Sequence, residues 1–282
     1  MVDKEPGPTS HDVVARARRL LGTKKVGHSG TLDPGATGLL LLGVGRATRL
    51  LKFLTALPKS YECEVVLGTE TSTLDDSGEV TATFDLVGVT LEQAREAARG
   101  LTGAILQVPP MVSAVKVGGR RLHELAREGI EVERAARPVT VHRFAVTAEV
   151  APGTFAVEVD CSSGTYVRTL AADLGMALGG GAHLRALRRT AIGPFGESTA
   201  RPLEDAELRS PAEALAFMDR VAVDEVTAEL VRRGRRLVRT GQAVTFEGDG
   251  PWAVIDAASG DLLAVYRAAG EQALPDVVLP PG

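Results

Sequence analysis

The sequence VGHSGTLDPGATGLLLLGVGRATRL, residues 26–50, contains the glycine-rich segment GHSGTLDPGATG at 27–38. Glycine, threonine and proline at this density predict that most of the segment is loop. Asp33 precedes a Pro-Gly pair, an order that favours a β-turn with the carboxylate at its first position. One interpretation is an aspartate that caps a turn; the other is a nucleophile presented beside His28 and Thr31. The two are compatible, because a turn can hold a carboxylate out of the core.

Periodic segments flank this loop on both sides. Upstream, Ser10 is predicted to cap a helix whose apolar positions share one face and which ends at Gly22. Downstream, the apolar run 39–44 is too short to distinguish a strand from the start of a helix, and residues 48–57 are predicted to be helical, ended by Pro58. Further along, the sequence predicts strands at 61–67, 79–84, 139–150, 155–161 and 184–192, and helices at 90–99, 165–178 and within 204–218.

The order of these elements indicates an α+β fold. Strands and helices mix without strict βαβ alternation, which disfavours a doubly wound sheet. Thr90 and Gln93 are predicted to form a capping box at the start of their helix. After about residue 222 the sequence changes to short strands with turns, which predicts a small, mostly β C-terminal domain. The strands expected there are 243–246, 252–255 and 262–266.

The composition is that of an ordinary globular protein, with 44% hydrophobic and 24% charged residues. No apolar run approaches the ~20 residues needed to span a bilayer, and the first residues lack the basic start and apolar core of a secretory signal. Cys63 and Cys161 are far apart and in no ligand spacing. They indicate a reducing cytoplasm rather than a disulfide framework or a zinc site. We therefore expect a cytoplasmic protein with no membrane association.

The net charge of −4 does not suggest a nucleic-acid binder, but the basic residues are clustered. Such clusters, taken alone, favour solvated helix faces. The alternative is a locally positive face that binds phosphates on an acidic protein. The clusters are Arg16–Arg18–Arg19–Lys24–Lys25, Arg185–Arg188–Arg189 and Arg232–Arg233–Arg235–Arg236–Arg239.

Short patterns typical of other chemistries are incomplete. Gly43-Val-Gly45 lacks the rest of a dinucleotide fingerprint, and His123-Glu124 is not followed by the second histidine of a zinc protease. Ser113-Ala-Val-Lys116 lacks the companion motifs of a serine acyltransferase, and the chain has no P-loop pattern. We interpret each of these as a chance match.

The glycine-rich segment closely resembles the signature loop of the TruB family of pseudouridine synthases, whose catalytic aspartate falls at Asp33. Other blocks resemble the family in the same order and extend the similarity over about residues 3–197. They are Lys59-Ser-Tyr61, Thr71-Ser-Thr73-Leu-Asp75, Val108-Pro-Pro-Met-Val-Ser113-Ala-Val-Lys116-Val-Gly118-Gly119, Arg137-Pro138-Val-Thr, Cys161-Ser-Ser-Gly164-Thr-Tyr166-Val-Arg168 and Gly181-Ala-His183-Leu-Arg185-Ala-Leu187-Arg188-Arg189.

This resemblance implies the pseudouridine synthase fold, a mixed, mostly antiparallel sheet flanked by helices, in residues 1–222. Residues 104–138 resemble the family's mobile insertion that closes over RNA, and residues 223–282 are implied to be a small PUA-like domain. The implied reaction is the isomerisation of the T-loop uridine of tRNA (position 55) on a flipped-out nucleotide. The resemblance further implies a monomer that needs no metal, organic cofactor or obligatory protein partner.

The resemblance also assigns roles to side chains. Asp33 is the implied nucleophile, and Arg168 is implied to pair with it and keep it ionised and oriented. Tyr61 is implied to stack on the target base and to serve as a general base, and His28 to wedge into the space that the base leaves. The other substrate-binding residues implied are Thr31, Tyr166, Leu187 and Lys4.

Several alternatives stay open. Arg168 could be a surface helix arginine, and Tyr61 and Leu187 could be plain core packing. The resemblance does not choose between attack at C1′, attack at C6 and a glycal route. An RNA chaperone and a guide-RNA-dependent synthase are the alternative functions.

The chain also departs from the family. The family usually reads Lys-Pro-x-Gly where this chain has Lys4-Glu5-Pro6-Gly7. Upstream residues that usually form a first strand are missing, which indicates a truncated chain or a misassigned start. Val112 and His123 stand where relatives often have tyrosine.

Overall fold

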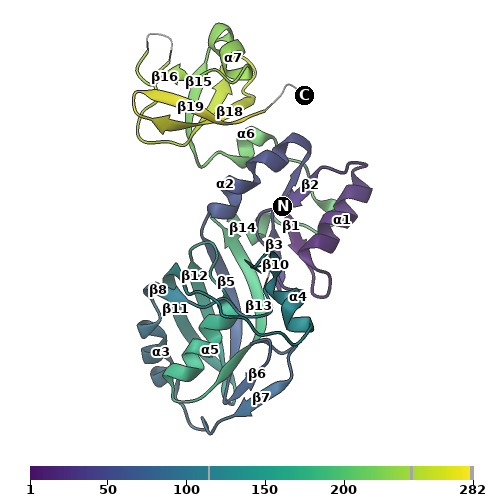
Figure 1. Ribbon diagram of the computed structural model, residues 1–282, viewed down its shortest axis with the longest axis vertical. Coiled ribbons are helices and arrows are strands. Elements are labelled where there is room, and N and C mark those ends of the chain that lie inside the picture. Colours follow the sequence, from purple (N-terminus) through teal and green to yellow (C-terminus); the bar gives the residue numbers. More distant parts are fainter. Residues whose placement is uncertain (114, 242–243, 280–282) are drawn as a thin grey trace.

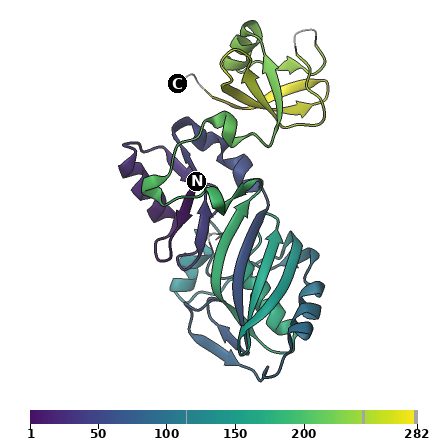
Figure 2. The same cartoon turned by 180° about the vertical axis from the view of Figure 1, so that it is seen from behind.

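The computed structural model describes residues 1–113, 115–241 and 244–279. A large part is built around one sheet, and a small β-rich part forms the C-terminal end of the chain (Figure 1 and, from behind, Figure 2). This arrangement confirms the predicted α+β fold with its small C-terminal domain. Within the described residues, every helix is too short or too polar to cross a bilayer.

The central sheet is mixed and mostly antiparallel. Its strands run in the order β1-β3-β13-β5-β12-β11-β8, and β14 pairs with β13. Neighbouring strands are antiparallel except β3 and β13, which run parallel. The strands are β1 (Val2–Lys4), β3 (Thr37–Leu40), β5 (Lys59–Leu67), β8 (Gly103–Gln107), β11 (Arg137–Ala151), β12 (Thr154–Cys161), β13 (Ala182–Ile192) and β14 (Phe195–Gly196). The sequence did not predict the short strands β1, β8 and β14.

One face of this sheet holds the main hydrophobic core. The apolar residues of β5 alternate with glutamates, so that they point to this face and are buried. Helices α3 (Leu91–Gly100) and α5 (Val167–Ala177) lie over it (Figure 1). The predicted capping box of Thr90 and Gln93 is present at the start of α3. Burial of side chains such as Leu170 stabilises the layer by about 1.5–3 kcal/mol each.

Residues from 219 onwards form the C-terminal domain. Its sheet has the order β15-β17-β18-β19-β16, and α7 packs against β18 and β19. The elements are β15 (Asp219–Val223), α7 (Glu225–Arg232), β16 (Leu237–Val238), β17 (Trp252–Asp256), β18 (Leu262–Ala269) and β19 (Gln272–Val278).

Two predictions for the C-terminal domain need correction. The boundary predicted after residue 222 falls inside β15, whose pairing with β17 places the whole strand in this domain. Of the strand predicted at 243–246, residue 243 lies outside the described residues, and Thr245 forms only an isolated bridge with Thr240.

The two parts of the chain share a hydrophobic core. Leu41 and Leu54 of the large part belong to the same buried cluster as Leu262 and Val265 of the C-terminal sheet. Lys52 of α2 (Leu51–Ala56) also lies 2.5 Å from Asp276 of β19. The C-terminal domain is therefore packed against the large part rather than tethered to it.

The N-terminal helix α1 (Ser10–Leu20) begins differently from the prediction. Its N-cap is Thr9, whose side chain accepts a hydrogen bond from the amide of Asp12. The predicted cap, Ser10, uses its hydroxyl instead to bond the backbone of Leu32. The Ser10 hydroxyl is directed at Leu32 and does not cap the helix. Ser10 therefore connects α1 to the glycine-rich loop.

The glycine-rich segment is mostly loop, as predicted, and lies between β2 (Val26–His28) and β3. The ambiguous run 39–44 forms strand, because it completes β3 and then β4 (Leu42–Val44) after a break at Leu41. The predicted helix at 48–57 is a 3₁₀ turn, η1 (Gly45–Leu50), followed by α2.

The predicted insertion, 104–138, is shorter than expected. Leu106 of β8 pairs with Pro138 of β11 at the sheet edge, so both ends belong to the central sheet. Between these strands lie β9 (Lys116–Val117), β10 (Arg120–Arg121) and α4 (Leu122–Arg127).

The remaining elements are β6 (Thr69–Thr71), β7 (Val80–Thr83), η2 (Glu197–Thr199), η3 (Leu203–Asp205) and α6 (Pro211–Ala214).

Gly38 lies where β3 approaches β13 most closely. It pairs with Arg189 across the parallel register, and its φ is +96°. A Cβ on Gly38 would lie 2.3 Å from the carbonyl oxygen of Arg189. Only glycine satisfies both constraints, because other residues rarely adopt this φ and would clash with backbone that cannot move aside.

We expect Gly38→Ala to lower the free energy of unfolding by about 2–6 kcal/mol, from backbone strain of about 1–3 kcal/mol and overpacking of a similar size. Gly7→Ala is the matched control, because Gly7 has φ +106° but nothing within 4 Å of an added Cβ. Urea unfolding of both variants measures the difference. Equal losses would contradict the close approach at Gly38.

Candidate active site

The loop between β2 and β3 is held by two buried polar side chains from the N-terminal segment. The Ser10 hydroxyl donates to the Leu32 carbonyl at 3.1 Å and accepts from the Leu32 amide at 2.8 Å. The Lys4 ammonium donates to the carbonyls of Pro34 at 3.1 Å and Ala36 at 2.6 Å. The loop has few hydrogen bonds of its own, so these side chains fix its path.

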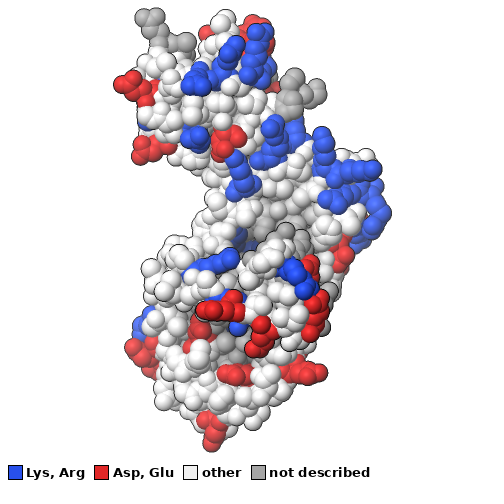
Figure 3. Space-filling model, in the orientation of Figure 1, with Lys and Arg blue, Asp and Glu red and all other residues white. Residues whose placement is uncertain are grey.

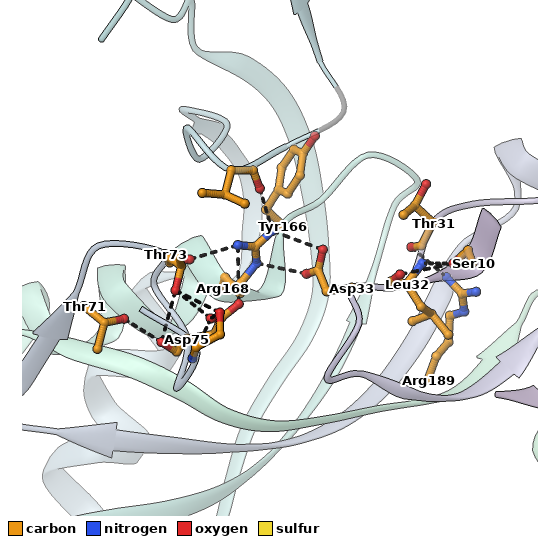
Figure 4. Close-up of polar contacts among 12 residues, drawn as sticks. Ser10, Thr31, Leu32, Asp33, Thr71, Thr73, Asp75, Tyr166, Arg168 and Arg189 are labelled. Carbon is orange, nitrogen blue, oxygen red and sulfur yellow. Dashed lines mark hydrogen bonds and ion pairs between the residues drawn. The ribbon is translucent and has the colours of Figure 1, made fainter. Parts of the chain in front are cut away.

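The carboxylate of Asp33 faces Arg168 of α5 (Figure 4). Asp33 begins a β-turn, as predicted, since the amide of Ala36 donates to its carbonyl at 3.1 Å. Arg168 Nε lies 3.0 Å from Asp33 Oδ2, and Nη2 donates to Oδ1 at 3.2 Å. This pairing is bidentate, so it sets the orientation of the carboxylate as well as its position. The Asp33 side chain remains 40% exposed, whereas that of Arg168 is 4% exposed.

All three nitrogen atoms of the Arg168 guanidinium contact oxygen atoms. Besides Asp33, Nη1 bonds the Thr73 carbonyl at 2.9 Å and lies 3.4 Å from Asp75 Oδ2, and Nη2 bonds the Val112 carbonyl at 2.8 Å. Three of these contacts are hydrogen bonds, the contacts of Nε with Asp33 and of Nη1 with Asp75 are ion pairs, and the side chain is 4% exposed. The alternative interpretation of Arg168 as a surface helix arginine is therefore wrong.

Burial raises the pKa of the Asp33 carboxyl above its ordinary value. The Arg168 guanidinium lowers this pKa, Asp75 raises it and the Lys4 ammonium lowers it. The ion pair therefore opposes burial without fully cancelling it. The result is a partly desolvated carboxylate, and desolvation makes an oxygen nucleophile more reactive than it is in water.

A cavity of about 260 Å³ lies beside this ion pair. It opens between the N-terminal end of α5 and the face of the sheet that carries the main core. The structure brings six of the eight sequence-predicted site residues into its wall. They are Thr31, Asp33, Tyr61, Tyr166, Arg168 and Leu187.

Strand register explains why Tyr61 and Leu187 meet in this wall. Across the antiparallel pair β5 and β13, Tyr61 lies opposite Arg189 and Cys63 lies opposite Leu187. Residues opposite each other point to the same face of a sheet, so all four side chains point to the face covered by α5. Tyr61 is half-buried, and burial raises the pKa of its phenol.

The other two predicted residues lie outside the cavity wall. His28 ends β2, and its Nδ1 is buried without a hydrogen-bond partner. Burial lowers the pKa of this imidazole, which favours the neutral form. Lys4 is 1% exposed and is engaged with backbone carbonyls. These contacts position the loop that presents Asp33, and contact of Lys4 with substrate stays a prediction.

Three residues that the sequence did not single out complete the site. The amide side chain of Gln107 bonds both the N–H and the carbonyl of Tyr166, at 2.7 and 3.1 Å, and so fixes the start of α5. Lys59 and Arg189 line the cavity and are buried. The alternation Leu187-Arg-Arg189 in a predicted strand was a usable signal, since it places Arg189 on the same face as Leu187.

The basic clusters differ in their environments. Arg185, Arg188 and Arg189 belong to β13, not to a helix, and the first two form ion pairs with Glu64 and with Asp3 and Glu197. In the view of Figure 3, Lys and Arg gather over α1 and the segment after it and are also present on the C-terminal domain, where Asp and Glu lie among them; over the lower half Asp and Glu are the more frequent. We call the exposed lysines and arginines of these segments the basic face; they are Arg16, Arg19, Lys24 and Lys25 of α1 and the segment after it, and Arg233, Arg235 and Arg236 of the C-terminal domain.

The fold and this site define a pseudouridine synthase. Residues 18–167 match the model described as the TruB family pseudouridylate synthase N-terminal domain, and residues 168–221 match the tRNA pseudouridylate synthase B C-terminal domain. The chain is 49% identical to the tRNA pseudouridine synthase B of Rhodococcus jostii (strain RHA1), with 100% of this chain and 93% of that protein covered. It is 46% identical to that of Arthrobacter sp. (strain FB24), with 100% and 96% covered.

Solved structures also have a fold similar to that of this chain. A chain from a Cbf5-Nop10-Gar1 complex superposes with a TM-score of 0.77 at 27% identity, covering 99% of this chain and 84% of that one. A chain from an H/ACA RNP bound to a substrate RNA containing 2′-deoxyuridine gives a TM-score of 0.75 at 24% identity, with 99% and 84% covered. The protein belongs to the TruB family.

We expect the Asp33 carboxyl to titrate above its ordinary pKa of 3.8. Arg168→Met should move the titration to higher pH, because removal of the guanidinium takes away the charge that favours the carboxylate. Carbon-13 NMR of aspartate-labelled protein measures this, with Asp33→Asn to assign the signal. Arg143→Met is the control, since Arg143 pairs with Glu158 on an exposed surface. Titration of Asp33 below 3.8 would contradict the burial argument.

Proposed function

We propose that this protein isomerises the T-loop uridine of tRNA (position 55) to pseudouridine with Asp33 as the nucleophile. The observation that supports this best is the bidentate pair of Asp33 and Arg168 in the wall of a cavity with Tyr61. Membership of the TruB family supports the reaction, and the name tRNA pseudouridine synthase B of the relatives supports tRNA as the substrate.

The proposed chemistry breaks the N1–C1′ bond of uridine, turns the uracil and joins C5 to C1′. Atoms and oxidation state are conserved, so the proposal includes no cofactor. The Asp33 carboxylate acts at the sugar or at the base while Arg168 holds it in one orientation. Orientation of a reactive group in this way can account for a large share of a rate enhancement, because the entropy of alignment is lost before the reaction.

The target nucleotide must leave its stack before it can reach Asp33, which costs a few kcal/mol. We propose that Tyr61 stacks on the extruded uracil, with Thr31, Tyr166 and Leu187 completing the pocket. Stacking is worth about 1–3 kcal/mol per base, enough to offset most of this cost. His28, held neutral by burial, suits the role of a wedge in the vacated space, because an uncharged imidazole stacks without desolvating a charge.

The proposed RNA-binding surface is the basic face over α1 and the C-terminal domain (Figure 3). Phosphate contacts made there would weaken steeply with added salt, because binding releases counterions from the RNA. We also propose that the segment between β8 and β11 closes over the bound stem–loop. The C-terminal domain is proposed to be PUA-like. We further propose a cytoplasmic monomer that acts without an obligatory protein partner.

The direct test is tritium release from a T-arm stem–loop labelled at uracil C5. Asp33→Asn should reduce the release at least about a thousand-fold, because removal of a nucleophile removes the covalent route itself. Its Kd for the stem–loop should stay within about threefold of wild type, since Asn is nearly isosteric with Asp. Asp249→Asn, an exposed aspartate of the C-terminal domain, is the matched control and should be unaffected.

Other outcomes would point to the alternatives. Full activity of Asp33→Asn would falsify the assignment of the nucleophile. Tight binding of the stem–loop by wild type without tritium release would favour an RNA chaperone. Release only after addition of a guide RNA and partner proteins would favour a guide-dependent synthase.

A further inference from the structure

Two buried cations lie in the cavity wall without an anionic partner. Lys59 is 5% exposed and Arg189 is 1% exposed. Arg189 donates to the carbonyls of Leu39, Gly30 and Thr31, and among the described residues neither cation forms an ion pair with a carboxylate. A buried charge is costly unless an opposite charge compensates it, so this pair needs an explanation.

The two side chains converge on one point of the glycine-rich loop. An added Cβ on Gly30 would lie 3.7 Å from Arg189 Nη1 and 3.9 Å from Lys59 Cε. Lys59 and Tyr61 are two residues apart on β5, and Arg189 lies opposite Tyr61 on β13. These positions place both cations on the same face of the sheet as Tyr61, in the wall that also contains Asp33.

A structural role accounts for only part of Lys59. Its ammonium donates to the carbonyls of Thr55 and Leu57, which lie at the end of α2, and a lysine there stabilises a helix. The ammonium has three donors, and these bonds use two of them. A neutral donor would satisfy the same carbonyls without the cost of burying a charge, so helix capping does not explain why a cation stands beside Arg189.

We propose that the Lys59 ammonium, supported by the Arg189 guanidinium, stabilises the negative charge that forms on uracil when its bond to the ribose breaks. This inference rests on the proposed function. Cleavage of N1–C1′ leaves the electron pair on the base, whose charge spreads over N1, O2 and O4. A fixed cation in a site that excludes water stabilises such a charge more strongly than water does, because it needs no reorganisation.

The step conserves atoms and electrons. The Asp33 carboxylate bonds C1′ as the N1–C1′ bond breaks, and the N1–C1′ electron pair stays on uracil. After the base turns, C5 donates an electron pair to C1′, a C5–C1′ bond forms and the Asp33 carboxylate leaves with the electron pair of its own bond to C1′. C5 then loses its proton, and N1 gains one. The anion exists only between the two bond changes, so a cation that favours it accelerates the reaction and also retains the free base in the pocket.

Lys59 also has a titration that can be followed. Burial lowers its pKa to about 8, and the nearby Arg189 guanidinium acts in the same direction. The other titratable groups around it are Cys161 of β12, with a pKa raised to about 11, Tyr61, with a raised pKa, and Asp33. Lys59 changes charge near pH 8 and is cationic below that pH.

The test measures single-turnover conversion of a labelled T-arm stem–loop across neutral to mildly alkaline pH, at protein concentrations well below Kd, so that the profile reports the pKa values of the free protein. The wild-type rate should fall as pH rises through about 8, where Lys59 loses its charge. Lys59→Met should lower the rate at neutral pH about 100-fold and abolish this alkaline fall. Lys59→Arg should retain most of the rate and lack the fall, because arginine stays protonated. Kd for the stem–loop should change less than about threefold in both variants.

Lys52→Met is the matched control, since it removes an exposed ammonium from the first turn of α2, away from the cavity wall. It should leave the rate and its pH dependence unchanged. Wild-type rate and pH profile in both Lys59 variants would overturn the proposal, as would a loss seen only in Kd, which would indicate a phosphate contact. If Lys59→Met does not fold, an unchanged alkaline fall in Lys59→Arg overturns it. Absence of any conversion by wild type would instead reject the proposed function.

Discussion

The bidentate ion pair between Asp33 and Arg168 is the interaction on which the site depends. It joins a loop near the N-terminus to a helix 135 residues further along the chain. The pair is asymmetric, because the arginine is buried and also bonds the carbonyls of Thr73 and Val112, while the carboxylate is partly exposed. Arg168 is therefore held in place, and the Asp33 carboxylate remains accessible. Any change that shifts the start of α5 by about an ångström would disturb the alignment of the carboxylate.

The loop that presents Asp33 is shaped by its surroundings rather than by its own hydrogen bonds. Lys4, Ser10 and Arg189, from three different elements, use their polar groups on the backbone of the loop or of the strand that follows it. Buried backbone groups need such partners, because an unpaired one costs about as much as a lost hydrogen bond. The central sheet therefore serves the site twice: it supplies two of these anchors, Lys4 and Arg189, and its core-bearing face forms the floor of the cavity.

Much of this organisation could be predicted from the sequence. Alternation identified the long central strands, the Thr90 capping box fixed the start of α3, and the Asp-Pro-Gly order gave the turn at Asp33. Short edge strands such as β1 and β8 were missed, because a few residues carry too little periodicity. The uses of Ser10 and Arg189 were missed for a different reason: each depends on a contact with a loop far away in the sequence. The family resemblance supplied the pairing of Asp33 with Arg168, which spacing alone does not reveal.

The most direct measurement is a crystal structure of the Asp33→Asn protein bound to a T-arm stem–loop. The proposed function requires the target uracil to be extruded and stacked on Tyr61. The residue 33 side chain should then lie about 3–3.5 Å from the ribose C1′ or the uracil C6 of that nucleotide. A complex in which the target base stays in its stack, or enters a different cavity with Arg168 and residue 33 turned away from the RNA, would contradict the role assigned to this ion pair.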